Sequence, residues 1–474
     1  MKLDFSDNIE FYGDKTDPSV IYAEFVVPSD NDSSLEKEYF VRIDSSIFES
    51  YIRVFVVPQL EEKTSVARLL VDIKDYFNLY PCEDEVAPKI RAAGYLQDGL
   101  IEYDLCNKQQ EYVKVSADRW EITTSHQHKF IKSSKHLAQV CPKKSNKSLL
   151  KLLKPYVNVS KRQLILFVAW LVQAFCQGSH HCLIISATKG CGKTTLSKAV
   201  QKILDNSKDT TVIMSSSQDH LLTTLTNSYV VAFDNCSDEL FDKNQSNILC
   251  CAVTGATYVK REAFSTNKQA SFDLQNILLI NGIGFCPPEA DLADRCLMLN
   301  LEPLEGKRKA DREIEDQFNR DLPYILGAIF TTISKAMKIY SSITPSKLPR
   351  MLESYVDMLS IAVALGISQD EFEEIYFENL ADIDRARADI AIIQAVREFM
   401  NSANVKGRKA SGTMTEIYKK VLSNYSGLKS DLPRSASRFS RKLTEEHGAL
   451  YQAGYVINID DTYDDGTHVT IIKK

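Results

Sequence analysis

The sequence predicts an α/β fold built around a parallel β-sheet, and two observations support this. Between residues 182 and 301, short continuous apolar runs alternate with segments of helix length. Strands that are buried on both faces have this composition, and a helix between two of them forms the crossover of a parallel sheet. In addition, a glycine-rich loop directly follows the first run. The runs predict five strands: LIIS from Leu183, TVIM from Thr211, YVVAF from Tyr229, ILLI from Ile277 and CLMLN from Cys296.

The composition limits the classes of protein that fit. The chain has 474 residues, and 44% of them are hydrophobic, which suggests about three domains. Because the net charge is −6, a protein that coats nucleic acid by bulk basicity is excluded, and any nucleic-acid site has to be a local patch.

Two further features concern the compartment. The 11 cysteines form no CxxC pair and no zinc-ligand spacing, and the start has no signal-peptide pattern, so a cytoplasmic location is expected. The longest apolar stretch, Leu164 to Cys176, has 13 residues and is too short to span a bilayer, so no membrane protein is expected.

Four regions are predicted along the chain. Residues 1–140 form a β-rich N-terminal region of unknown role, and residues 141–310 contain the parallel sheet with an apolar helix before it. That helix is expected to start at a capping box, Ser160 to Gln163, and Gly178 can end it. Residues 311–402 are expected to be a helical lid or connector, and residues 403–474 a small C-terminal domain.

The elements of the N-terminal region are predicted from alternating apolar residues and polar turns. A helix is expected at 65–77. Strands are expected at 19–27, 38–43, 52–57, 99–105, 112–115 and 120–124.

The loop after the first apolar run has the pattern of a phosphate-binding (Walker A) loop. It reads Ala187-Thr-Lys-Gly190-Cys191-Gly192-Lys193-Thr194-Thr195, and a small alanine stands where the first glycine is usual. Its glycines let backbone N–H groups and a helix N-terminus face phosphate oxygens. Lys193 is expected to reach the β- and γ-phosphates of ATP, and the Thr194 hydroxyl to bind Mg²⁺. The alternative is a Gly-Lys turn without a ligand.

A metal-binding carboxylate is predicted at the end of the third run. Tyr229-Val-Val-Ala-Phe-Asp234 has the Walker B pattern, so Asp234 is expected to bind Mg²⁺ together with Thr194, provided that their strands are neighbours. The alternative is an Asp that caps the next helix. Asn235 follows, where many ATPases carry a catalytic Glu, so the general base stays open among Asp234, Asp238 and Glu239.

Two further residues are candidates for catalysis. Asn281 ends the fourth run, where an amide can orient the attacking water or touch the γ-phosphate; the alternative is an Asn-Gly turn. Arg295 precedes the fifth run and can stabilise transition-state charge on ATP bound by an adjacent subunit. The alternative for Arg295 is a salt bridge with Asp294 or Asp291.

Two regions are candidates for DNA binding. Residues 255–272 read as two strands joined by a turn, with Lys260, Arg261 and Lys268 near aromatic residues; the alternative is a packing hairpin with solvated cations. The tail reads as a helix at 411–425, a second helix from Pro433, and two strands, which is the order of a winged helix.

The second helix of the tail is amphipathic. Phe439 and Leu443 are expected to face inward and Arg434, Arg438 and Arg441 outward, toward DNA. The alternative is a protein-binding winged helix, because the wing tip is acidic, with Asp460, Asp461, Asp464 and Asp465.

These motifs together resemble the AAA+ ATPases of phages, plasmids and integrative elements, the branch that includes the superfamily 3 replicative helicases. The resemblance covers about Gly99 to Leu359 and is carried by SATKGCGKTTLSKAV, SYVVAFDN, TGATYVKREAFSTNKQASF, ILLINGI and ADLADRCLMLNL. It implies a five-stranded core, a ring that is usually hexameric, Asn281 as sensor 1 and Arg295 as the arginine finger. It also implies that the hairpin around Lys260 grips DNA; for sensor 2, Arg350 is only a guess.

The resemblance implies a helicase or translocase that works in the replication of a mobile element and hydrolyses ATP with Mg²⁺. A primase or another replication protein stays open as a partner. The alternative function is an ATP-gated assembly or sensor module, regulatory or anti-phage, without unwinding activity. A P-loop kinase of a small metabolite would explain neither the inserted basic hairpin nor the tail.

Overall fold

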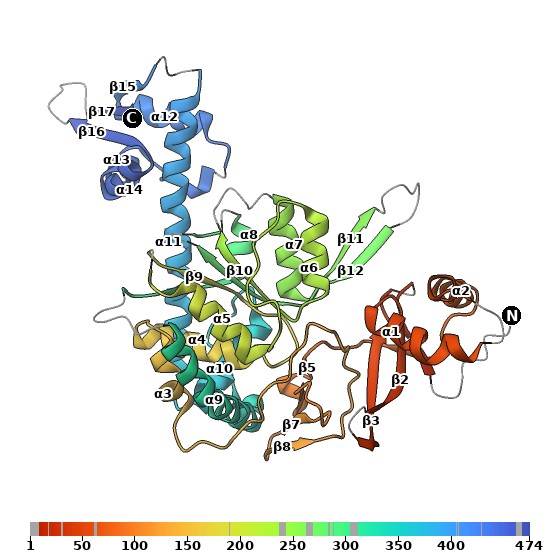
Figure 1. The fold of residues 1–474 in the computed structure, drawn as a ribbon. Coiled ribbons are helices and arrows are strands. Elements are labelled where there is room, and N and C mark those ends of the chain that lie inside the picture. The colour runs from red at the N-terminus through yellow and green to blue at the C-terminus, as the bar shows by residue number, and fades with distance from the viewer. Residues whose placement is uncertain are drawn as a thin grey trace. The chain divides into compact units, whose positions relative to one another are not determined.

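The fold is described from a computed structural model (Figure 1). It describes residues 9–17, 19–29, 32–60, 64–188, 190–236, 243–261, 269–282, 285–287, 289–303, 311–403, 405, 407–427, 429–460 and 467–474. The chain forms two compact units. The first comprises Met1–Phe285 with Asp294–Phe377, and the second comprises Cys286–Ala293 with Glu378–Lys474.

The first sheet of the first unit has the strand order β3-β2-β1-β4, and two helices pack on it. Its elements are β1 (Ile9–Asp14), β2 (Ile21–Ser29), β3 (Asp32–Arg42), α1 (Ser46–Tyr51), α2 (Val66–Leu79) and β4 (Glu85–Val86). The strands expected at 19–27 and 38–43 overlap β2 and β3. The helix expected at 65–77 is α2, and the Ser65 side chain caps it by accepting from the N–H of Arg68.

The prediction of a strand at 52–57 is wrong. This segment continues α1 as a π-helical turn, η1 (Ile52–Val56), and a 3₁₀ turn, η2 (Val57–Gln59). The Ser45 side chain accepts from the N–H of Phe48 and starts a helix just before it. Because Ile52 is buried while Val54 is exposed, one helical side contacts the core, and this packing overrides the β-propensity of the segment.

The second sheet is antiparallel, with the order β5-β6-β7-β8. It consists of β5 (Ala92–Ala93), β6 (Leu100–Asp104), β7 (Tyr112–Ser116) and β8 (Trp120–Thr123), and the 3₁₀ turn η3 (Leu96–Asp98) precedes β6. The last three of these strands were predicted from the sequence and are confirmed.

The predicted parallel sheet is present, with the order β10-β13-β9-β14. Its strands are β9 (Cys182–Ser186), β10 (Val230–Cys236), β13 (Ile277–Gly282) and β14 (Cys296–Asn300). The helices α5 (Lys193–Leu204), α6 (Gln218–Thr226) and α7 (Lys243–Thr254) lie between these strands in the chain.

The expectation of a fifth strand is wrong for the run from Thr211. Only Val212 pairs with the sheet, through a single parallel bridge to Phe233 beside β10. Ile213 is 81% exposed, so this edge lacks the burial that stabilises the four strands.

The predicted apolar helix before the sheet is α4 (Lys161–Gln173), which follows α3 (Leu149–Leu153) and the 3₁₀ turn η4 (Lys154–Tyr156). Ser160 caps α4 through the N–H of Gln163, but the Gln163 side chain accepts from the N–H of Asn300 and does not complete a capping box. The helix ends at Gln173, before Gly178.

The inserted hairpin is also present, as the antiparallel strands β11 (Thr257–Arg261) and β12 (Gln269–Asp273). In Figure 1 it lies beside α6 and α7. The region after the sheet is helical, as expected. It contains α9 (Asp311–Ile339), η6 (Tyr340–Ser342), α10 (Leu352–Ala364) and α11 (Gln369–Asn401), and the boundary between the two units falls inside α11.

The second unit contains the predicted helices and strands of the tail. A three-stranded sheet has the order β15-β17-β16, from β15 (Lys409–Thr413), β16 (Tyr455–Asp460) and β17 (His468–Lys473). Its helices are α8 (Ala290–Ala293), α12 (Met414–Asn424), α13 (Ala436–Glu445) and α14 (His447–Gln452), with the 3₁₀ turn η7 (Lys429–Asp431).

The first helix of the tail starts three residues later than expected. Residues 411–413 belong to β15, and a capping box between Thr413 and Glu416 starts α12. None of the described helices of the chain combines the length and the apolar composition that crossing a membrane requires.

Candidate nucleotide site and nucleic-acid surfaces

The predicted phosphate loop connects β9 to α5. Gly190 and Gly192 both have a φ of +85°, in the left-handed region that side chains rarely adopt, and Gly192 is the N-cap of α5. A Cβ at Gly192 would meet no atom within 4 Å, so the backbone conformation, and not a lack of space, requires glycine there. The described part of the loop therefore turns directly into a helix N-terminus, as a phosphate-binding loop requires.

The side chains of the loop differ in their hydrogen bonds and in their exposure to solvent. The ammonium of Lys193 donates to the carbonyl oxygens of Ala187 at 2.9 Å and Thr188 at 3.0 Å, so its charge lies across the loop. Cys191 is buried, with its Sγ 3.2 Å from the Oγ1 of Thr188, whereas Thr195 is exposed.

The predicted magnesium ligands lie together. The hydroxyl of Thr194 is 3.1 Å from each carboxylate oxygen of Asp234 and donates to it. Their strands are not neighbours, because β13 lies between β9 and β10. The two side chains meet because α5 passes from the end of β9 across the end of β13 toward β10, as its contacts with Asn281 and Asp234 require.

Asn281 links three elements at the same edge of the sheet. Its side chain is 1% exposed; Nδ2 donates to the Oγ of Ser197 on α5, and Oδ1 accepts from the N–H of Asn235 at the end of β10, both at 3.0 Å. The alternative of an Asn-Gly turn is wrong, because Asn281 and Gly282 both belong to β13. Sequence reasoning missed Ser197; its position four residues after Lys193, on the same face of the helix, was the available signal.

Asn235 has an unusual backbone conformation. Its φ is +57°, and the pairing of β10 with β13 is irregular between Phe233 and Cys236. Its side chain is exposed. The other candidates for the general base, Asp238 and Glu239, lie outside the described residues.

The donor set fits Mg²⁺. A hydroxyl and a carboxylate are the hard oxygen ligands that this ion prefers, and it commonly takes only one or two protein ligands together with phosphate oxygens. Among the described residues, no group of three or more His, Cys, Asp or Glu side chains forms a separate metal site. Burial raises the pKa of Cys236 to about 12, so this neighbouring thiol stays protonated and is a poor metal ligand.

Arg295 lies away from this cluster. It directly precedes β14, and its carbonyl oxygen accepts from the N–H of Cys182 at the start of β9, whereas the loop follows the end of β9. A five-residue strand, about 16 Å long, therefore separates it from the loop of its own chain. Asp294, one of the two carboxylates considered as partners of Arg295, forms an ion pair with Arg350 at 3.1 Å. Arg350, the residue suggested for sensor 2, therefore also lies at the end of the strands opposite to the loop.

The structure describes only part of the hairpin that was expected to contact DNA. The Lys260 ammonium forms an ion pair with the carboxylate of Asp219 on α6. Arg261 ends β11, but its side chain and the whole of Lys268 lie outside the described residues.

The second helix of the tail, α13, starts at Ala436 and not at Pro433, because the Ser435 side chain caps it by accepting from the N–H of Arg438, so Arg434 lies before the helix. The expected division into buried and exposed side chains is present. Phe439 and Leu443 are fully buried, whereas Arg434, Arg438 and Arg441 are exposed. Arg441 lies 3.5 Å from Glu445, and both side chains are more than half exposed, so this pair leaves the arginine accessible. Asp460 ends β16, and the other three acidic residues of the expected wing tip lie outside the described residues.

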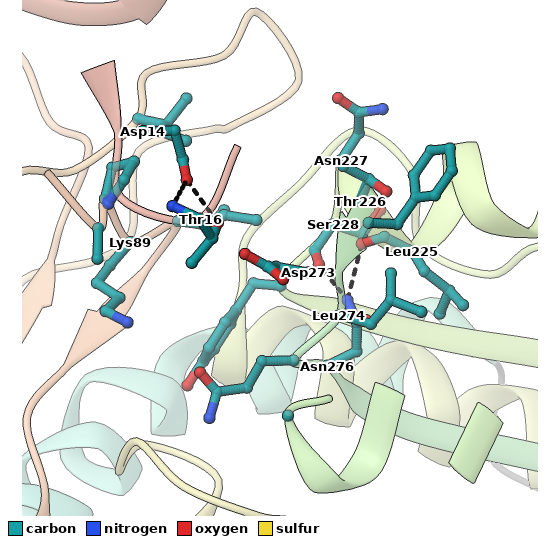
Figure 2. A pocket seen from close by; sticks show the side chains of 18 of the residues that line it. Asp14, Thr16, Lys89, Leu225, Thr226, Asn227, Ser228, Asp273, Leu274 and Asn276 are labelled. Carbon is teal, nitrogen blue, oxygen red and sulfur yellow. Dashed lines mark hydrogen bonds between the residues drawn. The ribbon is translucent and has the colours of Figure 1, made fainter. Parts of the chain in front are cut away.

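Two cavities lie away from the loop, with volumes of about 460 and 400 Å³. The first is bounded by Asp14, Thr16 and Lys89 on one side and by Asp273 and Asn276 on the other (Figure 2). None of the predicted site residues lines either cavity.

The central part of the chain matches a family model of a replication protein. A family model described as "Actinomycete integrative conjugative element replication protein" matches residues 148–368, which agrees with the mobile-element part of the resemblance. No curated protein matches the chain.

The chain also resembles solved structures at low identity. The apo A form of the NrS-1 C-terminal region is 11% identical with a TM-score of 0.40, over 98% of this chain and 97% of that one. A JCV helicase bound to a thiazolopyridine-containing acetamide is 13% identical with a TM-score of 0.21, over 50% of this chain and 70% of that one.

Proposed function

We propose that the chain is a magnesium-dependent ATPase that works on DNA during the replication of a mobile element, as a ring-forming helicase or translocase. The observation that carries the ATPase part is the cluster at the end of the parallel sheet. There the loop glycines, Lys193, Thr194, Asp234 and Asn281 come from three different elements and lie around one helix N-terminus.

The chemistry follows from the contacts of these side chains. The ammonium of Lys193 now donates to two neutral carbonyl oxygens, and a charged phosphate oxygen is a stronger acceptor, so the ammonium would turn to a triphosphate. Mg²⁺, when bound by Thr194 and Asp234, neutralises charge on the phosphates. Both polar atoms of Asn281 bond within the protein, so this residue holds α5 against β10 and keeps Thr194 beside Asp234.

The DNA part rests on separate support. The family model that matches residues 148–368 is described as a replication protein. Arg438 and Arg441 on α13, and Arg434 just before this helix, expose three positive charges. Arg295 lies at the end of the strands opposite to the loop. At this position an arginine can contact the nucleotide of a neighbouring subunit more readily than that of its own chain. A ring is therefore part of the proposal.

A second candidate is an ATP-gated assembly that does not unwind DNA. Two observations favour it: Lys260 is paired with Asp219, which reduces the charge available to a phosphate backbone, and Asn235 replaces the usual Glu. In this case ATP turnover would not depend on DNA.

Titration calorimetry with ATP and Mg²⁺ tests the ATPase part. We expect binding heat from the wild type and from Lys198→Ala, an exposed lysine on the same helix, but none from Lys193→Ala. A wild type that gives no heat refutes the proposal.

The hydrolysis rate with and without single-stranded DNA, and strand displacement on a forked duplex, separate the two candidates. Stimulation by DNA that is lost when Lys260 and Arg261 are both changed to Ala supports the motor. Turnover that is indifferent to DNA supports the gated assembly.

A further inference from the structure

We propose that Gln139 and Tyr103 are positioning residues for the nucleotide loop, acting through the far end of helix α5. The inference rests on the proposed ATPase function and goes beyond it, because it makes residues 91–139 part of what aligns the nucleotide site for hydrolysis. The argument starts from the backbone carbonyl groups at the end of this helix.

The last turn of α5 is capped by distant side chains. A helix leaves its last four carbonyl oxygens without partners inside the helix, and a glycine after the helix often satisfies them. Here the next residue is Asp205 in an extended conformation, and its N–H bonds only the carbonyl of Gln201. The Nε2 of Gln139 donates to the carbonyl oxygens of Lys202 at 2.9 Å and Ile203 at 3.2 Å.

The remaining carbonyl and the following residues are held from the same region. The hydroxyl of Tyr103 on β6 donates to the carbonyl oxygen of Leu204 at 3.0 Å. Arg91, which is fully buried, lies with its Nε 3.1 Å from the carboxylate of Asp205 and donates to the carbonyl oxygen of Asn206.

The segment that carries Gln139 is itself fixed between the helix and the antiparallel sheet. The N–H of Leu137 donates to the carbonyl oxygen of Asn206, and the N–H of Gln139 donates to that of Leu105, just after β6. The side chain of Asn206 returns a hydrogen bond to the carbonyl of Ala138. Side-chain and backbone bonds therefore join residues 91–139 to the end of α5.

The consequence concerns the other end of the helix. Lys193 and Thr194 form its first turn, and Ser197 one turn later contacts Asn281. A 12-residue helix is a nearly rigid rod, so a change in position at residues 202–206 displaces Thr194 relative to Asp234. Binding through the loop N–H groups is local and would survive such a change, whereas catalysis needs the aligned arrangement.

The test compares Gln139→Ala and Tyr103→Phe with Asn276→Ala. Asn276 is a matched control: it is buried, and its Nδ2 donates to the carbonyl oxygens of Leu225 and Ser228, so it caps the end of α6 in the same way (Figure 2). For each variant, kcat and KM for ATP are measured together with the unfolding temperature.

We expect kcat to fall about tenfold for Gln139→Ala and about threefold for Tyr103→Phe, with KM changed by less than about twofold. Asn276→Ala should lower the unfolding temperature but leave kcat within about twofold. If the three variants lose kcat only in proportion to their loss of stability, the positioning role is refuted. An inactive wild type would instead refute the ATPase proposal.

Hydrogen exchange gives a second measurement that does not depend on variants. A nonhydrolysable ATP analogue with Mg²⁺ should slow exchange at the amides of Leu137 and Gln139, because a fixed α5 holds their hydrogen bonds closed. Unchanged exchange at both amides, with the analogue bound, contradicts the inference.

Discussion

Replacing Asn281 by Ala tests the central contact of the candidate site. The side chain is 1% exposed and makes one hydrogen bond to Ser197 and one to the N–H of Asn235. Each net hydrogen bond is worth about 1 kcal/mol, and the lost packing adds a similar amount, so the expected loss of stability is about 2 to 4 kcal/mol. Ser197 keeps its bond to the carbonyl of Lys193, which places the effect in the lower part of this range.

The matched comparison is Asn276→Ala, just before the same strand. Asn276 is equally buried and also makes two hydrogen bonds, so we expect a similar loss of stability, measured by urea denaturation. The two variants should differ in activity. Asn281→Ala releases α5 from β10 and should lower kcat for ATP about a hundredfold, whereas Asn276→Ala should lower it less than about twofold.

The result that would refute this reasoning is equal kcat in the two variants at equal stability. Asn281 would then act only as a core residue, and the alignment of α5 with β10 would not limit hydrolysis. Nucleotide binding measured by calorimetry should survive in both variants, since neither residue belongs to the loop.

Three other predictions concern the metal, the DNA and pH. Thr194→Ala should raise the Mg²⁺ concentration required for half-maximal hydrolysis about tenfold, and a normal magnesium dependence would contradict the proposed ligand. Changing Arg434, Arg438 and Arg441 to Ala should reduce the slope of log affinity for duplex DNA against log salt concentration by about 2 to 3. An unchanged slope argues against DNA binding by these arginines. The control is the double variant Lys419→Ala and Lys420→Ala on α12. Burial lowers the pKa of His181 to about 3, below its usual 6.5, so the unfolded chain binds a proton that the folded chain does not, and stability falls as pH falls below about 6.5. The free-energy advantage of the wild type over His181→Gln should therefore shrink by about 1.4 kcal/mol per pH unit between pH 6 and 4, and a constant difference in urea denaturation would contradict the assigned protonation.

The strands of the parallel sheet could be predicted where a continuous apolar run indicates that both faces of the strand are buried. Ile184 and Leu279 belong to continuous apolar runs, and both are fully buried. The run from Thr211 has a similar composition, but whether another strand covers its far edge is a property of the complete fold. The segment from Ile52 failed for a related reason, because a helix started upstream and core contact on one side outweighed a composition typical of strands.

Residues of the candidate site could be predicted when they belong to a short sequence motif, and were missed when only the fold brings them together. Lys193 and Thr194 follow from nine consecutive residues, and Asp234 follows from the apolar run directly before it. Ser197 lies within the same helix but carries no motif. Gln139 is 63 residues from the carbonyl that it caps, so no local pattern connects the two, and only the fold brings them together.

The left-handed backbone at Asn235 disfavours a glutamate after Asp234, where many ATPases carry one. Asparagine tolerates this conformation better than almost any other residue with a side chain, whereas glutamate would be strained by about 1 kcal/mol or more. Installing a glutamate there to obtain a faster enzyme would therefore work against the backbone conformation at Asn235, whose N–H donates to Asn281. The backbone conformation at position 235 therefore limits the amino acids that fit there, independently of what catalysis requires.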